Sequence, residues 1–147
     1  MYSFKQIGLP EKESIKELFT SVFTKEPWND NWDDKQQLDL CIQELIGQDF
    51  SLSFGLYKDE ELVGISLGYI KHWYTGTEYL INEFCIKTDL QRCGAGTFFI
   101  SEIEKTIKEI GINHIFLLTE RDAPAFKFYK KNGFIPCEST VAFIKEV

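Results

Sequence analysis

A turn that carries two glycines is the strongest chemical signal in the sequence. It reads Gln91-Arg92-Cys93-Gly94-Ala95-Gly96 and lies between an apolar strand pattern at 79–86 and an amphipathic helix pattern that begins at the turn. Glycine lets the backbone approach a ligand closely, and the first N–H groups of a helix are unpaired and carry the positive end of its dipole. The pattern therefore predicts an anion site, most naturally for a pyrophosphate, on residues 92–97. A plain tight turn is the alternative interpretation.

Two common nucleotide motifs do not fit this turn. The dinucleotide pattern G-x-G-x-x-G requires a third glycine where the sequence has Phe99, and the lysine of the phosphate-binding loop is absent.

A second motif lies at 125–134, where the sequence reads Ala-Phe-Lys-Phe-Tyr-Lys-Lys-Asn-Gly-Phe. Its spacing indicates a short helix that ends near Gly133, a residue suited to the left-handed conformation after a helix.

Taken together, the two motifs resemble those of the GNAT superfamily, the acyl-CoA-dependent N-acyltransferases. The turn is similar to the family's Q/R-x-x-G-x-G/A motif, and residues 125–134 are similar to its A-x-x-F-Y-x-x-x-G-F helix. The resemblance implies that residues 1–147 form a single N-acetyltransferase domain of the α/β class, with a mixed, mostly antiparallel sheet, flanking helices and splayed central strands. It also implies acetyl-CoA (coenzyme A) as the cosubstrate.

The resemblance further implies which residues contact the coenzyme. In the family, main-chain groups of the turn hold the pyrophosphate, and main-chain groups at the end of the central strand contact the pantetheine and acetyl groups. One position departs from the pattern, because Asp122 stands where asparagine is common; helix capping is its alternative role. The expected coenzyme-binding residues are Cys85, Ile86, Lys87, Gln91, Arg92, Cys93, Gly94, Ala95, Gly96, Thr97, Asp122 and Ala125.

Acetyl transfer from a thioester to an amine needs a base for the ammonium proton, because alkylammonium groups have a pKa of about 10. Glu83 is the first candidate. Strand alternation places it on one face with Ile81 and Cys85, close before the turn, and the matching family position often carries an acid. Glu78 is the reserve candidate. A strand carboxylate that faces solvent or a lysine is the alternative interpretation of Glu83.

The departing thiolate needs a proton, and Tyr129 is the expected donor because it matches the family's tyrosine near the coenzyme sulfur. The alternative is a packing role for its ring. Cys85 and Cys93 lie near the expected site, but no histidine is close to either in the sequence to serve as base for a covalent route. We therefore expect direct transfer in a ternary complex, with Glu83 and Tyr129 as the catalytic residues.

The acceptor side is expected in the first half of the chain, where residues 26–49 contain seven acidic side chains and a single base. Carboxylates interleaved with indole rings favour a cationic amine through ion pairing and cation–π contact. An aminoglycoside-like or polyamine-like amine is the sharper interpretation; the alternative is that the tryptophans only anchor the loop to the core. The expected substrate-binding residues are Trp28, Asp30, Trp32, His72 and Trp73.

Periodicity predicts the elements that must position these residues. Helical spacing of apolar residues predicts helices at 10–23, 34–46, 96–110 and 125–132, with Asp33 or Asp34 as the cap of the second. Apolar runs predict strands at 2–7, 52–56, 62–69, 79–86, 112–118 and 141–147. The strand at 112–118 has the apolar composition of a buried central strand, and His114 within it is expected in the core.

Charge narrows the choice of partners. The net charge is -7, and this excess lies in residues 1–93, whereas residues 94–147 are neutral. A negative surface repels phosphate backbones, so nucleic acid, including charged tRNA, is disfavoured.

The sequence shows neither a secretion signal nor a membrane-spanning apolar run, which favours a cytoplasmic protein without a membrane partner. The cysteine and histidine spacing fits no metal site, so the four thiols are expected to be free and mostly buried.

The leading hypothesis is therefore an N-acetyltransferase that acts on a small cationic amine. A protein or peptide amine is the second hypothesis, which a shallow groove in place of a closed acidic pocket would favour. The third is a non-catalytic regulatory module that binds acyl-CoA; Asp122 supports it, and the presence of both Glu83 and Tyr129 opposes it. The sequence does not decide between a monomer and a homodimer.

Overall fold

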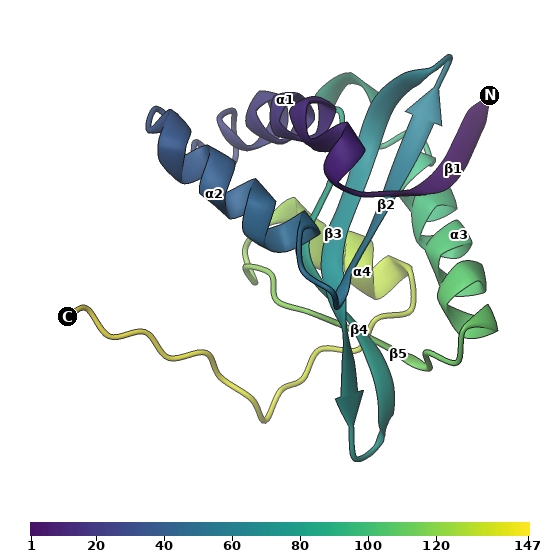
Figure 1. The fold of residues 1–147 in the computed structure, drawn as a ribbon. Helices are drawn as coiled ribbons and strands as arrows, with labels where there is room; N and C mark the ends of the chain where they lie inside the picture. Colours follow the sequence, from purple (N-terminus) through teal and green to yellow (C-terminus); the bar gives the residue numbers. More distant parts are fainter.

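A five-stranded sheet forms the centre of the computed structural model, which describes residues 1–147 (Figure 1). The strands lie in chain order, antiparallel from β1 to β4 and parallel between β4 and β5. They are β1 (Tyr2–Ile7), β2 (Ser51–Lys58), β3 (Glu61–Trp73), β4 (Gly76–Ile86) and β5 (His114–Leu117). The helices are η1 (Leu9–Glu11), α1 (Lys12–Phe23), α2 (Lys35–Ile46), η2 (Thr88–Leu90), α3 (Ala95–Glu109) and α4 (Pro124–Lys131). The predicted α/β class with a mixed, mostly antiparallel sheet is confirmed.

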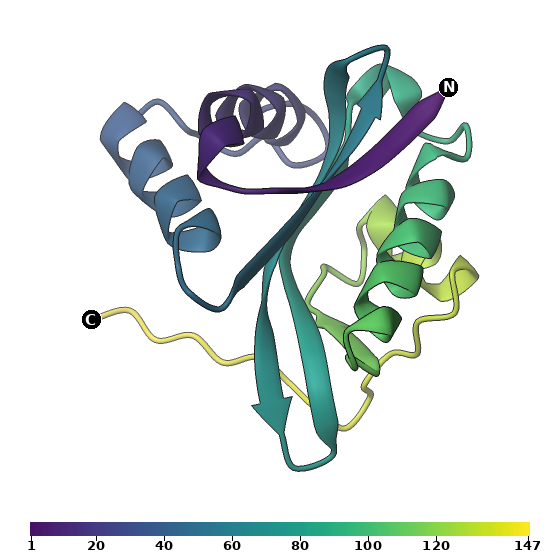
Figure 2. The ribbon, with the colours of Figure 1, turned by 45° about the vertical axis from the view of Figure 1, so that its right-hand side comes forward.

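Helices cover both faces of the sheet. α1 and α2 lie on one face, and α3 and α4 lie on the other (Figure 2). Each face has its own apolar cluster: one joins α1 and α2 mainly to β3, and the other joins α3 to β2 and β4. Helical spacing explains the first cluster, because α1 buries Ile15, Leu18, Phe19, Val22 and Phe23.

One extra residue in β4 changes the direction of its side chains. Ile81 pairs with Gly68 and Glu83 pairs with Leu67, so Asn82 between them has no partner on β3. This irregularity is a β-bulge, which places two residues of one strand opposite one residue of its neighbour. Because side chains alternate between the faces, the bulge reverses the face for every residue that follows it.

The bulge corrects a sequence prediction. Strand alternation placed Glu83 on one face with both Ile81 and Cys85. In the structure, Ile81 packs in the α3 cluster, whereas Cys85 packs in the α1–α2 cluster. Glu83 follows the bulge and shares the face of Cys85, so it points to the side of α1 and α2. Local periodicity could not show this, because a bulge is defined by the pairing with β3.

The bulge also depends on a glycine in the partner strand. A Cβ at Gly68 would clash with the carbonyl oxygen of Leu80 and lie 2.8 Å from the Tyr79 ring. We expect Gly68→Ala to lower the free energy of unfolding by about 3 kcal/mol, because neither the backbone nor a fully buried ring moves without loss of packing. Chemical denaturation measures the change. Gly8→Ala is the control, since a Cβ at Gly8 meets nothing within 4 Å; equal stability of the two variants would contradict the prediction.

β4 and β5 separate after a short contact. Their pairing runs from Glu78 with His114 to Ile81 with Leu117, and β4 then continues to Ile86 without a partner on that side. The predicted splay of the central strands is therefore present. It leaves part of one edge of β4 open between α3 and α4.

Most predicted elements are confirmed, and one is not. Asp34 caps α2 by accepting a hydrogen bond from the N–H of Gln37 at 3.0 Å, and Gly47 follows the last residue of the helix. The strand expected at 141–147 is absent, because residues 135–147 form neither helix nor strand. Their composition suits a strand, but their one backbone hydrogen bond, from the N–H of Thr140 to the carbonyl oxygen of Cys137, lies within the segment, so they pair with no other strand. The structure also has no helix with the length and apolar character that a bilayer crossing requires.

Two expectations about buried residues are wrong. His114 is exposed, and its Nδ1 lies 2.9 Å from Oδ1 of Asn113, because β5 stands at the edge of the sheet. The four cysteines are free as expected, but only Cys85 is buried. Cys41 is half-buried, and Cys93 and Cys137 are exposed.

Candidate active site

The glycine turn presents a row of unpaired backbone donors at the start of α3. Gly94 precedes the helix with a φ of +88°, a left-handed conformation that favours glycine, and α3 begins at Ala95. None of the backbone N–H groups of residues 92–97 donates to another backbone group. A Cβ at Gly94 would meet no atom within 4 Å, so the space in front of the turn is open. Unpaired donors, the helix dipole and open space suit an anionic group.

The two sequence motifs meet at Gly96. A Cβ there would lie 2.8 Å from Cε1 of Phe128, so the missing side chain lets α4 pack on the first turn of α3. Gln91 ties the turn to β4, because its Nε2 donates to the carbonyl oxygen of Ile86 at 2.9 Å. Ala95 is fully buried and supports the turn from within. Side-chain contacts therefore fix the turn while its backbone donors remain free.

The other expected residues of the turn lie at the surface. Arg92, Cys93 and Thr97 are exposed, and Sγ of Cys93 lies 2.7 Å from the carbonyl oxygen of Leu90. Arg92 has a φ of +62°, so the left-handed backbone begins before Gly94. This curvature turns consecutive N–H groups toward one side, as in the anion-binding concavities called nests.

The open edge of β4 offers two further backbone donors. The N–H of Lys87 donates to the carbonyl oxygen of Val63 at 2.7 Å, which makes these residues a hydrogen-bonded pair of the antiparallel ladder. Such pairs recur at every second residue, so Cys85 also turns its backbone toward β3. The N–H groups of Phe84 and Ile86 point the other way, into the gap beyond the end of β5.

This ladder changes the expected main-chain contacts. Cys85 and Lys87 use their N–H groups within the sheet, and the Lys87 side chain is hydrogen-bonded to Glu61 at the surface. Ile86, an expected coenzyme-binding residue, has a free N–H on the side of the gap. Phe84 supplies the second one, and sequence reasoning missed it, because only the pairing register shows which residues face the gap.

Tyr129 belongs to an aromatic group that holds α4 over the open part of β4. Its ring centroid lies 6.3 Å from that of Phe84 and 5.2 Å from that of Phe134. Burial raises the pKa of the Tyr129 phenol, and the charges of Cys85 and Glu83 raise it further. The phenol therefore stays protonated at neutral pH and can donate a proton.

Glu83 is a largely buried carboxyl group on the opposite face of β4. Burial raises its pKa from 4.5 to about 7, and the charge of Asp30 adds to the shift. No hydrogen bond or cation of the protein opposes this shift. A carboxyl group with a pKa near 7 is about half ionised at neutral pH and is suited to accept a proton.

Cys85, next to these groups, is not suited to act as a nucleophile. Burial raises the pKa of its thiol, and the charge of Glu83 raises it further. The thiolate is the reactive form of cysteine, so the buried thiol is unreactive at neutral pH. This favours a route without a covalent acyl-enzyme.

The loop between α1 and α2 is anchored by its two tryptophans. The ring centroid of Trp28 lies 5.7 Å from that of Phe23, and that of Trp32 lies 5.3 Å from that of Phe19, both edge-to-face. Both indoles are half-buried, which agrees with the anchoring interpretation, and Nε1 of Trp32 is buried without a partner. Asp30, between them, is exposed, and its N–H donates to the carbonyl oxygen of Phe23 at 2.8 Å.

Some acids of residues 26–49 have structural roles. Asp34 caps α2, and Asp39 forms ion pairs with Lys12 at 2.9 Å and Lys16 at 3.1 Å. Hydrogen bonds from these lysines hold the pKa of Asp39 below its ordinary value. The excess of free carboxylates near Glu83 is thus smaller than the residue count suggests. Asp30 is the carboxylate whose charge raises the pKa of Glu83.

His72 and Trp73 lie far from Glu83. Trp73 is at the tip of the β3–β4 hairpin, six residues along β3 from Leu67, the partner of Glu83. At the usual rise of a strand this separation is about 20 Å. Both aromatic side chains are exposed. The structure therefore does not bring these two expected acceptor residues together with Asp30.

Two other candidates are also away from the reacting groups. Glu78 pairs with Lys71 near the hairpin tip, at the far end of β4 from Glu83. Asp122 is exposed and does not cap α4, whose N-terminal flanking residue is Ala123. Ala125 is half-buried in the first turn of α4.

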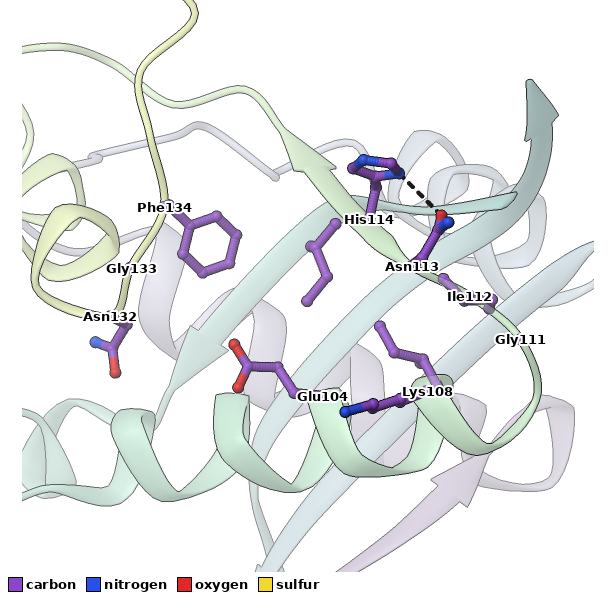
Figure 3. Close-up of a pocket in the computed structure, with 11 residues that line it drawn as sticks. Glu104, Lys108, Gly111, Ile112, Asn113, His114, Asn132, Gly133 and Phe134 are labelled. Carbon is purple, nitrogen blue, oxygen red and sulfur yellow. Dashed lines mark hydrogen bonds between the residues drawn. The ribbon is translucent and has the colours of Figure 1, made fainter. Parts of the chain in front are cut away.

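A groove of about 450 Å³ lies outside this site, between α3 and β5 (Figure 3). It shares no residue with the glycine turn or with the Glu83 region, and it meets the aromatic group around Tyr129 only at Phe134. The structure contains no group of three or more His, Cys, Asp or Glu side chains that could hold a metal ion.

A sequence model of known proteins matches most of the chain. The model is described as the acetyltransferase (GNAT) family and matches residues 12–134, which include both motifs, Glu83 and Tyr129. The chain belongs to the GNAT acetyltransferase family. Membership confirms the resemblance found in the two motifs and makes the protein an acyl-CoA-dependent N-acetyltransferase. No curated protein sequence matches the chain significantly.

Solved GNAT structures share the fold at low sequence identity. An aminoglycoside acetyltransferase from an uncultured soil metagenomic sample, in complex with sisomicin, superposes with a TM-score of 0.77 at 21% identity, over 99% of this chain and 96% of that one. AAC(6')-Iy, in complex with the bisubstrate analogue CoA-S-monomethyl-acetylneamine, gives 0.75 at 16%, over 100% and 99%. A ribosomal-protein-alanine N-acetyltransferase from Brucella melitensis biovar Abortus 2308 gives 0.76 at 13%, over 100% of both chains. At these identities the likeness confirms the GNAT fold and leaves the acceptor open.

Proposed function

We propose that this GNAT protein transfers the acetyl group of acetyl-CoA to the primary amine of a small cationic acceptor, directly and within a ternary complex. The observation that carries the proposal is Glu83. Its carboxyl group has a pKa of about 7, to which the charge of Asp30 contributes. It projects from β4, the strand whose open edge beyond β5 offers free N–H groups. A base and an electrostatic clamp are thus held on one rigid strand.

The residues around the turn fit an acyl coenzyme A. The unpaired N–H groups of residues 92–97 and the start of α3 would hold the pyrophosphate, and Gly94 leaves the approach open. The gap between β4 and β5 would admit the pantetheine arm beside Phe84 and Ile86. When bound, acetyl-CoA supplies an activated thioester. One GNAT neighbour, AAC(6')-Iy, is crystallised both with coenzyme A and with an analogue of it, which supports this assignment.

The chain's own groups then have distinct tasks. Glu83 accepts the proton of the acceptor ammonium, which frees the amine lone pair to form the C–N bond. The N–H groups of Phe84 and Ile86 stabilise negative charge on the carbonyl oxygen. Tyr129 donates its proton to the sulfur as the C–S bond breaks. The proton that Glu83 takes up returns to solvent. The second proton that the nitrogen loses as the amide forms replaces the one that the phenol gave to the sulfur.

A cationic acceptor is supported by the charge around Glu83. Two carboxyl groups, Glu83 and Asp30, lie near each other, and no lysine or arginine opposes the raised pKa of Glu83. An ammonium group placed between them would supply the missing positive charge. Solved neighbours include aminoglycoside acetyltransferases, which supports a small polyamine-like substrate class. The neighbours also include a ribosomal-protein-alanine N-acetyltransferase, so a protein or peptide amine is the second candidate.

Two measurements test the proposal in sequence. Acetyl-CoA at 100 times its dissociation constant should stabilise the folded protein by about 2.7 kcal/mol, read as a rise in melting temperature. Thiol release from acetyl-CoA should then depend on an amine from a panel of aminoglycosides, polyamines and peptides. Absence of stabilisation would contradict the coenzyme assignment. Turnover of peptides alone would replace the small cationic acceptor with a protein amine.

Asp30 gives a sharper test of the acceptor. We expect Asp30→Asn to raise KM for a cationic acceptor about fivefold and to leave kcat nearly unchanged, because it removes an attraction that is partly screened by solvent. Asp33→Asn is the matched control in the same loop. An equal effect of both variants would mean that the general surface charge, and not a contact at Asp30, sets the affinity.

A further inference from the structure

Tyr79 is a fully buried tyrosine of β4 to which the proposed reaction gives no task. Its ring lies in the apolar cluster on the α3 face, edge-to-face with Phe54 at 5.7 Å between centroids. Phenylalanine would fill nearly the same space without a polar atom, and a buried hydroxyl group is costly unless it is hydrogen-bonded. The hydroxyl group of Tyr79 is therefore of interest for the partner that it has.

That partner is Ser66 of β3, which is also fully buried. Oγ of Ser66 lies 2.8 Å from the hydroxyl oxygen of Tyr79, and this hydroxyl group also donates to the carbonyl oxygen of Ser66 at 3.3 Å. Burial raises the pKa of the phenol, so it stays protonated and can donate. The two side chains thus satisfy each other inside an apolar cluster.

This hydrogen bond crosses the β-bulge. Tyr79 pairs with Ile70, before the bulge. Ser66 pairs with Phe84, after it. The ring of Tyr79 uses the space left by Gly68, where a Cβ would lie 2.8 Å from it. Because the backbone ladder is disrupted at a bulge, the side-chain bond ties β3 to β4 where backbone pairing is weakest.

The Ser66 end of this bond lies beside the groups proposed to react. Ser66 and Phe84 form a pair without ladder hydrogen bonds, in which the side chains of the two strands lie closest. The N–H of Phe84 therefore faces the gap. Leu67, next to Ser66, pairs with Glu83. A shift of β3 at Ser66 would thus move both a proposed donor to the carbonyl oxygen and the proposed base.

We propose that Tyr79 is a positioning residue for acetyl transfer. Its hydrogen bond to Ser66 holds β3 across the bulge, and β3 in turn fixes the free N–H of Phe84 and the direction of Glu83. This inference rests on the proposed function. Loss of the bond should lower kcat about tenfold, because small displacements of reacting groups are costly for the rate. Acetyl-CoA affinity should change little, since the backbone donors of residues 92–97 lie on the turn beyond β4.

Two variants separate positioning from stability. Tyr79→Phe leaves the hydroxyl group of Ser66 buried without a partner and should lower the free energy of unfolding. Adding Ser66→Ala removes that hydroxyl group and should recover most of the loss. The fall in kcat should persist in the double variant, with the dissociation constant of acetyl-CoA unchanged. A double variant that regains kcat together with stability would overturn the proposal. Tyr57→Phe, in a half-buried tyrosine packed on the α1–α2 cluster, is the control and should keep kcat.

Nuclear magnetic resonance of protein labelled with ¹⁵N-phenylalanine gives a measurement that needs no substrate. The amide signal of Phe84 should move in Tyr79→Phe and in the double variant, and it should not move in Tyr57→Phe. The signal of Phe54 reports the direct loss of the hydroxyl group, because its ring contacts Tyr79. A Phe84 signal that stays in place while that of Phe54 moves would overturn the proposal. Absence of acetyl transfer by the wild type would instead contradict the proposed function, and the Phe84 signal would still decide whether Tyr79 positions β4.

Discussion

Replacing Glu83 with glutamine is expected to lower kcat/KM for the amine acceptor about 10²- to 10⁴-fold at neutral pH. The amide keeps the size of the side chain but cannot accept the ammonium proton. Affinity for acetyl-CoA should change little, because Glu83 points to the α1–α2 face, whereas the proposed coenzyme contacts lie in the gap and at the turn. Steady-state kinetics and a coenzyme titration separate the two quantities. Glu78→Gln, on the same strand, is the matched control and should retain activity.

The pH profile gives this prediction a signature that a structural role would not produce. Because the base must be ionised and its pKa is about 7, kcat/KM should rise about tenfold per unit up to that pH, beyond the change due to the amine itself. Glu83→Gln should lack this component. If the variant and the wild type follow the same profile, Glu83 is not the base.

The same pKa shift means that the ionised form of Glu83 lowers the free energy of unfolding. Its pKa is raised in the folded state, so its favourable contribution is fully present below the unfolded value of 4.5 and is lost as the pH rises through about 7. Glu83→Gln cannot ionise and should therefore be more stable than the wild type above pH 7, by up to about 3 kcal/mol. Denaturation curves at both ends of the range check this sign. A variant that is more active or less stable above pH 7 would contradict the proposed role.

Replacing Tyr129 with phenylalanine is expected to lower kcat about 10²-fold while leaving acetyl-CoA affinity nearly unchanged. Phenylalanine keeps the ring contacts with Phe84 and Phe134, so stability should also be nearly unchanged. What is lost is a proton donor that stays protonated because burial raises its pKa. Tyr69→Phe is the control, because that ring packs on Phe50 near the start of β2.

Single-turnover kinetics with bound acetyl-CoA would isolate the chemical step of the Tyr129→Phe variant. A loss of coenzyme affinity with kcat preserved would assign Tyr129 to packing. A full loss of both would mean that the hydroxyl holds α4 in place. Only a fall in kcat with affinity preserved agrees with proton donation to the sulfur.

Local patterns predicted the features that are local. The glycine turn, the start of α3 and the helix predicted at 125–132 follow from residues that are neighbours in the chain, and the structure has all three. The cap at Asp34 and the apolar face of α1 follow from spacing in the same way. Resemblance to a family joined the two motifs, and the structure brings them into contact at Gly96 and Phe128.

What sequence reasoning missed depends on pairing between distant segments. The face of Glu83 is set by a bulge against β3, and the free N–H of Phe84 is set by the register of the same strand pair. The influence of Asp30 on Glu83 links a loop and a strand that are far apart in the chain. His72 is one of the expected substrate-binding residues, but a long hairpin carries it away from Glu83. None of these relations leaves a pattern in a single segment.

The extra residue at Asn82 has a consequence for the order of events in catalysis. Because the bulge turns Glu83 to one face of β4 while the free N–H groups look into the gap at its edge, the two proposed ligands approach the strand from different directions and meet only at the reacting atoms. Neither has to leave before the other can enter. We expect mutations in the acceptor loop to change substrate preference without disturbing the handling of the thioester.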